Sequence, residues 1–168
     1  MKQSLSILLL ASLPVLALAA GDHAGHDHGK AAEKSEAGMS HEAHDSTAGK
    51  AGDPANVSRV IEVTMDDSMR FTPAAIQVKA GETIRFLISN QGKLTHEMVL
   101  GSMDELKEHA DMMRKMPGMQ HAESNMISLK SGQRGGIVWQ FTRAGAVDFA
   151  CLVPGHMEAG MVGKIKVD

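Results

Sequence analysis

The chain has 168 residues, a formal net charge of −3 and a single cysteine, Cys151. This length accommodates one domain with additional segments, and the weakly acidic balance includes no basic patch dense enough to predict nucleic-acid binding. A single cysteine excludes an intramolecular disulfide, so the thiol is paired with another molecule, reactive, or bound to a metal. The residues around Cys151 must decide among these three states.

The first segment, residues 1–19, has the pattern of a secretory signal peptide. Lys2 precedes an apolar run from Leu5 to Leu18, and a small-x-small sequence ends at Ala19. The run is shorter than the roughly 20 residues that a membrane-spanning helix needs, and it has no polar face. We therefore expect cleavage before residue 20 and export of the rest of the chain, with no membrane span.

Residues 20–56 are expected to form a disordered tail. They contain no aromatic side chain and almost no branched apolar one, so they bury too little surface to offset the entropy of ordering. Short histidine-rich tracts often bind metal. Imidazole suits Cu(II), but also Zn(II) and Ni(II), and the alternative is a flexible spacer with incidental histidines. The histidines concerned are His23, His26, His28, His41 and His44.

Residues 57–168 predict one all-β domain. Short apolar or alternating runs bounded by turn residues are typical of strands, and their spacing indicates a β-sandwich or barrel. The expected strands cover residues 57–65, 75–78, 83–89, 127–129, 136–141, 146–151 and 162–167.

One helical insert interrupts this strand pattern. Ser102 and Glu105 form the Ser-x-x-Glu capping box that opens a helix, and Pro117 followed by glycine ends it. Methionines in this insert either fill gaps against the sandwich or offer thioethers to Cu(I). Packing is the favoured explanation for Met112 and Met116. The accessory copper candidates are His109, Met112, Met113, Met116, Met119 and His121.

The main metal candidates lie near the end of the chain. Cys151, His156 and Met161 fall within eleven residues, between two expected strands. One cysteine and two histidines with a weak axial methionine are the donors of mononuclear copper of the blue type. A compact loop cannot surround the ion, and His96, which follows the strand ending near residue 90, is the best candidate for the second histidine. Met157 competes for the axial position, but it follows His156 directly and is expected to point away.

The sequence Cys151-x4-His156-x4-Met161 resembles the copper-binding loop of plastocyanin/azurin-like cupredoxins. Ile76-Gln-Val78 and the final strand, residues 163–167, also resemble that family. The resemblance implies an eight-stranded Greek-key β-sandwich with copper near one end, and electron transfer through a partly exposed His156. Those proteins have asparagine directly after the first copper histidine, whereas this chain has Glu97. The difference bears on the potential and colour of the site, because contacts around the ligands tune the metal.

We call the histidine-rich residues 20–56 the leader. With this leader and its methionine-rich insert, the whole chain is similar to the periplasmic, CopI-like cupredoxins linked to copper tolerance in Gram-negative bacteria. Binding or handing on copper is the first functional hypothesis, because a pure electron carrier needs neither feature. The alternative is a diffusible electron carrier for a respiratory oxidase or reductase. Both hypotheses allow a redox or copper-transfer protein as partner.

An enzyme is not expected. A multicopper oxidase needs several His-x-His pairs for its trinuclear cluster, and the one such pair, His26-Asp-His28, lies in the expected tail. The length also leaves no room for a second cupredoxin domain. We therefore predict a redox-active, non-enzymatic protein with one copper at the main site. The accessory residues either bind further copper or serve for packing and as a spacer.

Overall fold

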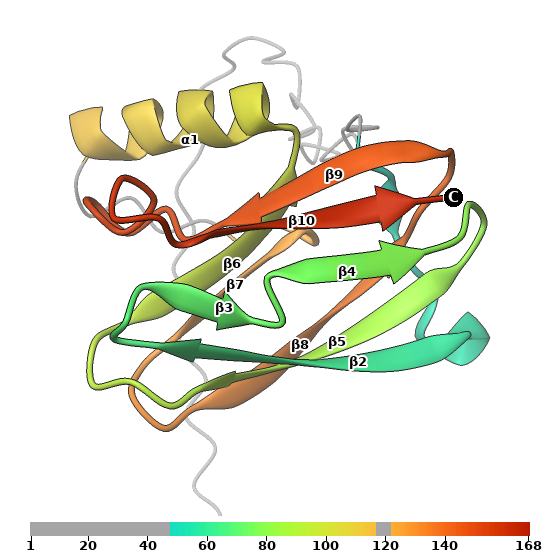
Figure 1. Ribbon diagram of the computed structural model, residues 1–168, viewed down its shortest axis with the longest axis horizontal. Coiled ribbons are helices and arrows are strands. Elements are labelled where there is room, and N and C mark those ends of the chain that lie inside the picture. Colours follow the sequence, from blue (N-terminus) through green and yellow to red (C-terminus); the bar gives the residue numbers. More distant parts are fainter. Residues whose placement is uncertain (1–47, 117–121) are drawn as a thin grey trace, which may run out of the picture. The chain divides into compact units, whose positions relative to one another are not determined.

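The structure, a computed structural model, describes residues 48–116 and 122–168. They form two five-stranded sheets, with strand orders β1-β8-β5-β2-β3 and β4-β10-β9-β6-β7 (Figure 1). The first sheet consists of β1 (Lys50–Ala51), β2 (Arg59–Asp66), β3 (Arg70–Thr72), β5 (Thr83–Asn90) and β8 (Arg134–Gln140). The second consists of β4 (Ala75–Val78), β6 (His96–Gly101), β7 (Met126–Leu129), β9 (Gly145–Ala150) and β10 (Val162–Val167). The expected all-β sandwich with one helix is confirmed.

The core lies between the two sheets and follows from the alternation of side chains along each strand. In β5, Ile84, Phe86 and Ile88 are buried, while the residues between them face outward at least in part. Alternate residues of a strand point to the same face of the sheet, so these three side chains share one face. Phe71 of the first sheet meets Phe149 of the second edge-to-face, with ring centroids 4.9 Å apart. These contacts hold the two sheets against each other.

Secondary structure begins before residue 57, the expected start of the domain. Residues 48–56, which the sequence assigned to the tail, contain β1 and the short 3-10 helix η1 (Pro54–Asn56). β1 pairs with the edge of β8, and Trp139 Nε1 donates to the carbonyl of Ala48 at 2.9 Å. This segment is ordered by partners elsewhere in the chain rather than by its own apolar residues. β3 and β6 were also absent from the seven strands expected from the residue patterns, so the described residues contain ten strands.

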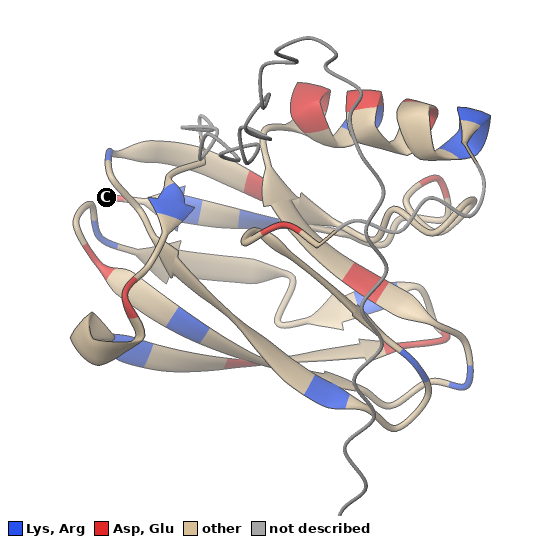
Figure 2. Ribbon diagram, turned by 180° about the vertical axis from the view of Figure 1, so that it is seen from behind, with Lys and Arg blue, Asp and Glu red and all other residues tan. Residues whose placement is uncertain are grey.

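Helix α1 (Met103–Lys115) begins at the predicted capping box. The Ser102 hydroxyl accepts from the amide of Glu105 at 3.3 Å, and the Glu105 carboxylate accepts from the amide of Ser102 at 2.6 Å. Acidic residues occupy the first turn and basic residues the last, as the helix dipole favours (Figure 2). Among the described residues, no helix is long and apolar enough to cross a membrane.

One face of α1 covers part of the second sheet (Figure 1). Its buried residues, Leu106 and Ala110, are one turn apart and point the same way. They belong to a small apolar group that we call the helix cluster. The helix cluster consists of Val99, Leu106, Ala110, Ala150 and Leu152. Because Ala150 and Leu152 flank Cys151 in the chain, α1 packs against the two neighbours of the candidate thiol ligand.

Candidate metal centre

The ligand loop, residues 151–161, follows β9 and folds back on itself before β10. The amide of Cys151 donates to the carbonyl of Met161 at 3.1 Å, so the two ends of the loop are held together. Within the loop, the amide of Met161 donates to the carbonyl of His156 at 3.0 Å. Gly155 has a φ of 88°, which glycine adopts without steric cost. This tight turn brings the His156 ring back towards Cys151.

His96 reaches the ligand loop from a distant part of the sequence. It is the first residue of β6 and is 0% exposed. The segment before it is held by the buried Asn90, whose amide group donates to the carbonyls of Leu94 at 2.7 Å and Leu129 at 2.9 Å. β6 pairs with the last residues of β9, so its beginning lies beside Cys151.

The side chains of His96, Cys151 and His156 form one cluster. Their candidate ligand atoms all lie within 4.8 Å of one another, and Cys151 Sγ is 3.3 Å from His156 Nδ1. The two imidazole rings have centroids 4.9 Å apart. His96 Nδ1 is buried without a hydrogen-bond partner, which is unfavourable unless another group binds it. One thiol and two imidazoles are donors that suit copper or zinc, so the cluster fits a metal ion.

Burial favours the neutral forms of Cys151 and His156 when no metal is bound. Desolvation raises the pKa of Cys151 to about 11, although the backbone amide of Glu97 opposes this shift. Desolvation and the neighbouring His96 lower the pKa of His156, so this imidazole stays neutral near pH 7. A metal binds a thiolate and neutral imidazoles. Metal binding near pH 7 therefore has to displace a proton from Cys151 but none from His156.

The two methionines of the ligand loop have different surroundings. Met161 is 0% exposed and belongs to the same core cluster as Cys151. Met157 is partly buried and packs against the helix cluster instead. The structure thus places Met161, and not Met157, in the apolar surroundings of the thiol.

Glu97 contacts the thiol through its backbone. Its amide donates to Cys151 Sγ at 3.3 Å. A hydrogen bond of this kind stabilises negative charge on sulfur and so helps to tune a bound metal. The contact does not depend on which side chain follows His96, so the glutamate at this position is compatible with it.

Comparison with known proteins decides which metal this cluster serves. Residues 57–168 match the family model described as "Copper binding proteins, plastocyanin/azurin family". The chain belongs to this copper-binding family. Its cluster of His96, Cys151 and His156 is suited to a copper site of the cupredoxin kind.

Two similar proteins carry a more specific name. The copper-resistant cuproprotein CopI of Rubrivivax gelatinosus is 50% identical over 159 residues, which cover 95% of this chain and 94% of that protein. CopI of Pseudomonas aeruginosa is 36% identical over 154 residues, covering 74% of this chain and 84% of that protein. This cupredoxin is therefore CopI-like, as its sequence predicted.

Solved structures support the fold alone. Auracyanin of Roseiflexus castenholzii aligns with a TM-score of 0.56 at 22% identity, covering 67% of this chain and 98% of its own. Auracyanin A of Chloroflexus aurantiacus aligns with a TM-score of 0.55 at 23% identity, covering 65% and 98%. At this level of identity the likeness establishes a cupredoxin sandwich and no shared partner.

The accessory candidates in α1 of this cupredoxin do not pack as the sequence favoured. Met112 is 41% exposed and Met116 is 39% exposed, and both line a surface hollow with Glu108, Asp111 and Lys115. The gap-filling explanation is wrong for these two methionines, because Leu106 and Ala110 occupy the buried face. The remaining described candidates, His109 and Met113, are partly buried. Outside the described residues lie His23, His26, His28, His41, His44, Met119 and His121.

Sequence reasoning missed one side chain at the centre. Asp67, in the turn between β2 and β3, lies with Oδ1 3.2 Å from His96 Nε2. Asp67 and His96 are separated by 29 residues. No spacing rule connects an aspartate in one turn with a histidine that begins another strand, so only the fold shows this contact.

Proposed function

We propose that this cupredoxin is an exported, redox-active protein of the periplasm that acts in copper tolerance by binding copper or handing it on. The observation that carries the proposal is the exposure of Met112 in α1 and of Met116, the residue that follows α1. Thioethers are selective ligands for Cu(I), and an electron carrier with one buried copper has no use for them at its surface. The name and near full-length similarity of the CopI protein of Rubrivivax gelatinosus support the same role.

At the main site, the proposed ligands are His96, Cys151, His156 and Met161. Copper held by such donors changes between Cu(I) and Cu(II) and so accepts or donates one electron. The buried backbone holds His96 and Cys151 in place, while the partly exposed His156 offers a route for the electron or the ion to a partner. The amide of Glu97 would stabilise the sulfur charge.

Accessory copper would be held by softer and looser ligands. At the C-terminal end of α1, the exposed thioethers of Met112 and Met116 share one hollow with the carboxylates of Glu108 and Asp111. The imidazole of His109 and the thioether of Met113 lie on the same helix. The histidines of the leader complete the set of accessory donors that the sequence offers.

The second candidate function is a diffusible electron carrier for a respiratory oxidase or reductase. The partial exposure of His156 at the surface of the metal centre favours it. Neither function needs catalysis by the protein itself, and we propose that the chain is not an enzyme.

Growth of the source bacterium in copper tests the proposal. Deleting the gene should increase copper sensitivity, and the intact gene should restore growth. The variant Cys151→Ser, exported to the same level, should restore it poorly. Unchanged growth in copper, together with lost respiration on one electron acceptor, would instead support the electron carrier. Recovery of the protein from the cytoplasmic rather than the periplasmic fraction would contradict the proposed location.

A further inference from the structure

A carboxylate stands behind one of the copper ligands. The turn after β2 presents Asp67 to the segment before β6, where its carboxylate accepts from the amide of Lys93 at 2.8 Å and of Leu94 at 3.2 Å. The same carboxylate lies 3.2 Å from His96 Nε2. These two backbone bonds hold the carboxylate in place beside the imidazole ring.

This contact decides which imidazole nitrogen of His96 carries the proton. An ionised carboxylate can only accept a hydrogen bond, so Nε2 must carry the hydrogen and donate it to Asp67. Neutral imidazole has one N–H, and Nδ1 is then left with its lone pair. Nδ1 is the buried atom without a hydrogen-bond partner, in the cluster with Cys151 and His156. The atom that is free to bind copper is thus the one that the carboxylate leaves unprotonated.

We propose that Asp67 is a positioning residue of the copper centre, which holds His96 in the Nε2–H form and directs Nδ1 towards the metal. The proposal rests on His96 being a ligand, as proposed above. It adds that a residue in a turn of the opposite sheet determines which nitrogen of His96 binds the metal. A fixed negative charge behind the imidazole also makes it a stronger donor and favours Cu(II) over Cu(I).

Gly92 provides independent support for this role. A Cβ atom at residue 92 would collide with Asp67 Oδ1. Gly92 has no positive φ, so its backbone conformation does not require glycine. Its amide donates to the side chain of Asn90 at 2.9 Å, which fixes the segment against which the carboxylate packs. The absence of a side chain at Gly92 is explained by the approach of Asp67.

The turn that carries Asp67 is itself well fixed. The amide of Met69 donates to the carbonyl of Asp66 at 3.1 Å, and the amide of Ser68 donates to the Asp66 carboxylate at 2.9 Å. Asp66 thus stabilises the turn, while its neighbour faces His96. Asp66 has the same charge as Asp67 but does not contact His96, so it provides a matched control.

The first test uses the metal-free protein and does not depend on copper. Nitrogen-15 NMR of the His96 ring reports which nitrogen carries the hydrogen. We expect the Nε2–H form in the unmodified protein, in Asp67→Asn, whose amide oxygen still accepts the bond, and in Asp66→Asn. Asp67→Ala should produce a mixture of both forms. Gly92→Ala should also produce a mixture of both forms, although it leaves the aspartate unchanged. Unchanged backbone amide signals of the strands would show that each variant is folded.

The second test uses the copper-loaded protein. Asp67→Asn should raise the reduction potential, because it removes the charge and keeps the hydrogen bond, whereas Asp66→Asn should change it much less. Asp67→Ala should weaken copper binding by about 10–100-fold, as loss of such a partner typically does.

An Nδ1–H form in the metal-free protein would overturn the proposal. So would identical potentials for the two asparagine variants. A further variant, His96→Ala, separates this outcome from failure of the proposed ligand set. If His96→Ala retains copper and an unchanged visible spectrum, the ligand assignment itself is wrong; if it loses them while the Asp67 variants behave normally, only the role of Asp67 is wrong.

Discussion

Met157 and Met161 are chemically identical side chains four residues apart, and their neighbours give them different roles. Met161 lies in the core beside Cys151, and Met157 lies against the helix cluster. The sequence favoured Met161 as the axial ligand because Met157 follows His156 directly. The surroundings found in the structure support that choice for a physical reason, since only Met161 shares the environment of the thiol.

Exchange of each methionine for leucine should separate these roles. Met161→Leu should keep copper but change the visible spectrum and raise the reduction potential, because Cu(II) loses a weak axial donor. Met157→Leu should change neither property. Both substitutions nearly conserve volume and should each cost less than about 1.5 kcal/mol in unfolding free energy. Spectra and potentiometry of the two purified variants provide the measurement, and equal effects from both would contradict the assignment.

The site could be predicted from sequence only where its residues are close in the chain. Cys151 and His156 follow from the spacing of one loop, and His96 follows from its place after a strand together with family resemblance. Asp67 could not be found this way, because its contact with His96 depends on how a turn of one sheet meets the beginning of a strand in the other. Spacing along the sequence can suggest candidate ligands, but the residues that hydrogen-bond to those ligands are brought there by the fold.

Among the secondary-structure elements, α1 shows what a local signal can and cannot predict. The Ser102–Glu105 capping box correctly predicted its start. Its orientation was not predictable, because methionine is compatible with either a buried or an exposed face. The structure buries Leu106 and leaves Met112 exposed. β1 and β3 were missed for a related reason: each is too short for a hydrophobic period, and each is formed by pairing with a longer strand.

Stability measurements can check this orientation of α1. Leu106→Ala should lower the unfolding free energy by about 2–5 kcal/mol, because it leaves a cavity beneath the helix. Met112→Ala should change it by less than about 0.5 kcal/mol, since the side chain is on the solvent side. Denaturant unfolding of the metal-free proteins would measure both values. A larger loss for Met112→Ala than for Leu106→Ala would mean that the helix is rotated from the orientation described.

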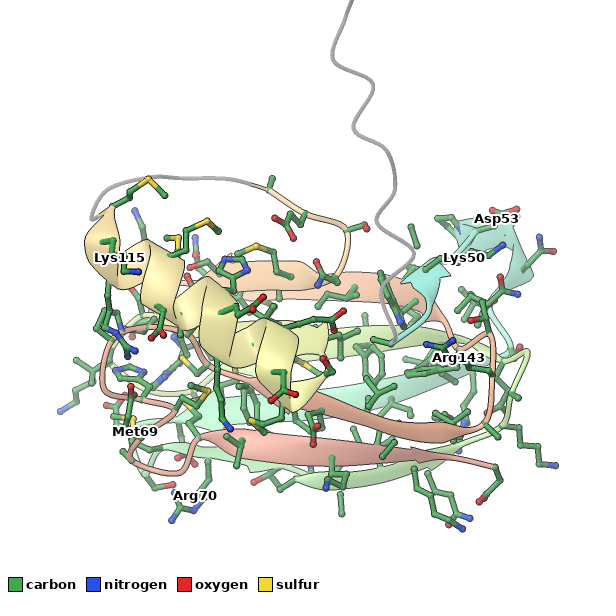
Figure 3. The ribbon with its side chains drawn as sticks, turned by 90° about the horizontal axis from the view of Figure 1, so that it is seen from above. Lys50, Asp53, Met69, Arg70, Lys115 and Arg143 are labelled. Carbon is green, nitrogen blue, oxygen red and sulfur yellow. The ribbon has the colours of Figure 1, made fainter. Side chains whose placement is uncertain are left out.

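At the scale of the whole molecule, the chain enters the fold far from the copper centre. Figure 3 shows Lys50 and Asp53 at one end of the sandwich and Met69 and Arg70 at the other. Arg70 donates to the carbonyl of Ala159 at 3.0 Å, so the second end is that of the ligand loop. β5, which extends between the two ends, has eight residues and a length of about 23 Å.

This separation limits which leader histidines can contact their own copper centre. His44 precedes Ala48 by four residues and so reaches at most about 14 Å from it. His41 reaches at most about 25 Å, which is close to the length of β5 itself. His28 is 20 residues from Ala48 and reaches up to about 70 Å.

We expect the two groups of leader histidines to differ in copper delivery. Alanine at His23, His26 and His28 should slow the filling of the main centre after one equivalent of copper is added. Alanine at His41 and His44 should leave that rate unchanged. Stopped-flow measurement of the thiolate-to-copper absorption would record the filling, with a leader-deleted chain as reference. Equal filling rates for the two alanine variants and the leader-deleted chain would show that the leader does not deliver copper.

Attachment of β1 at the remote end therefore has a kinetic consequence. Copper held by the first three histidines can arrive within one molecule, in a first-order step whose rate does not depend on protein concentration. Copper held by His44 can reach a main centre only after dissociation or in an encounter with a second molecule, at a rate that rises with concentration. We therefore expect the position of this two-residue strand to set the kinetic order of any copper transfer from the leader histidines to the main centre.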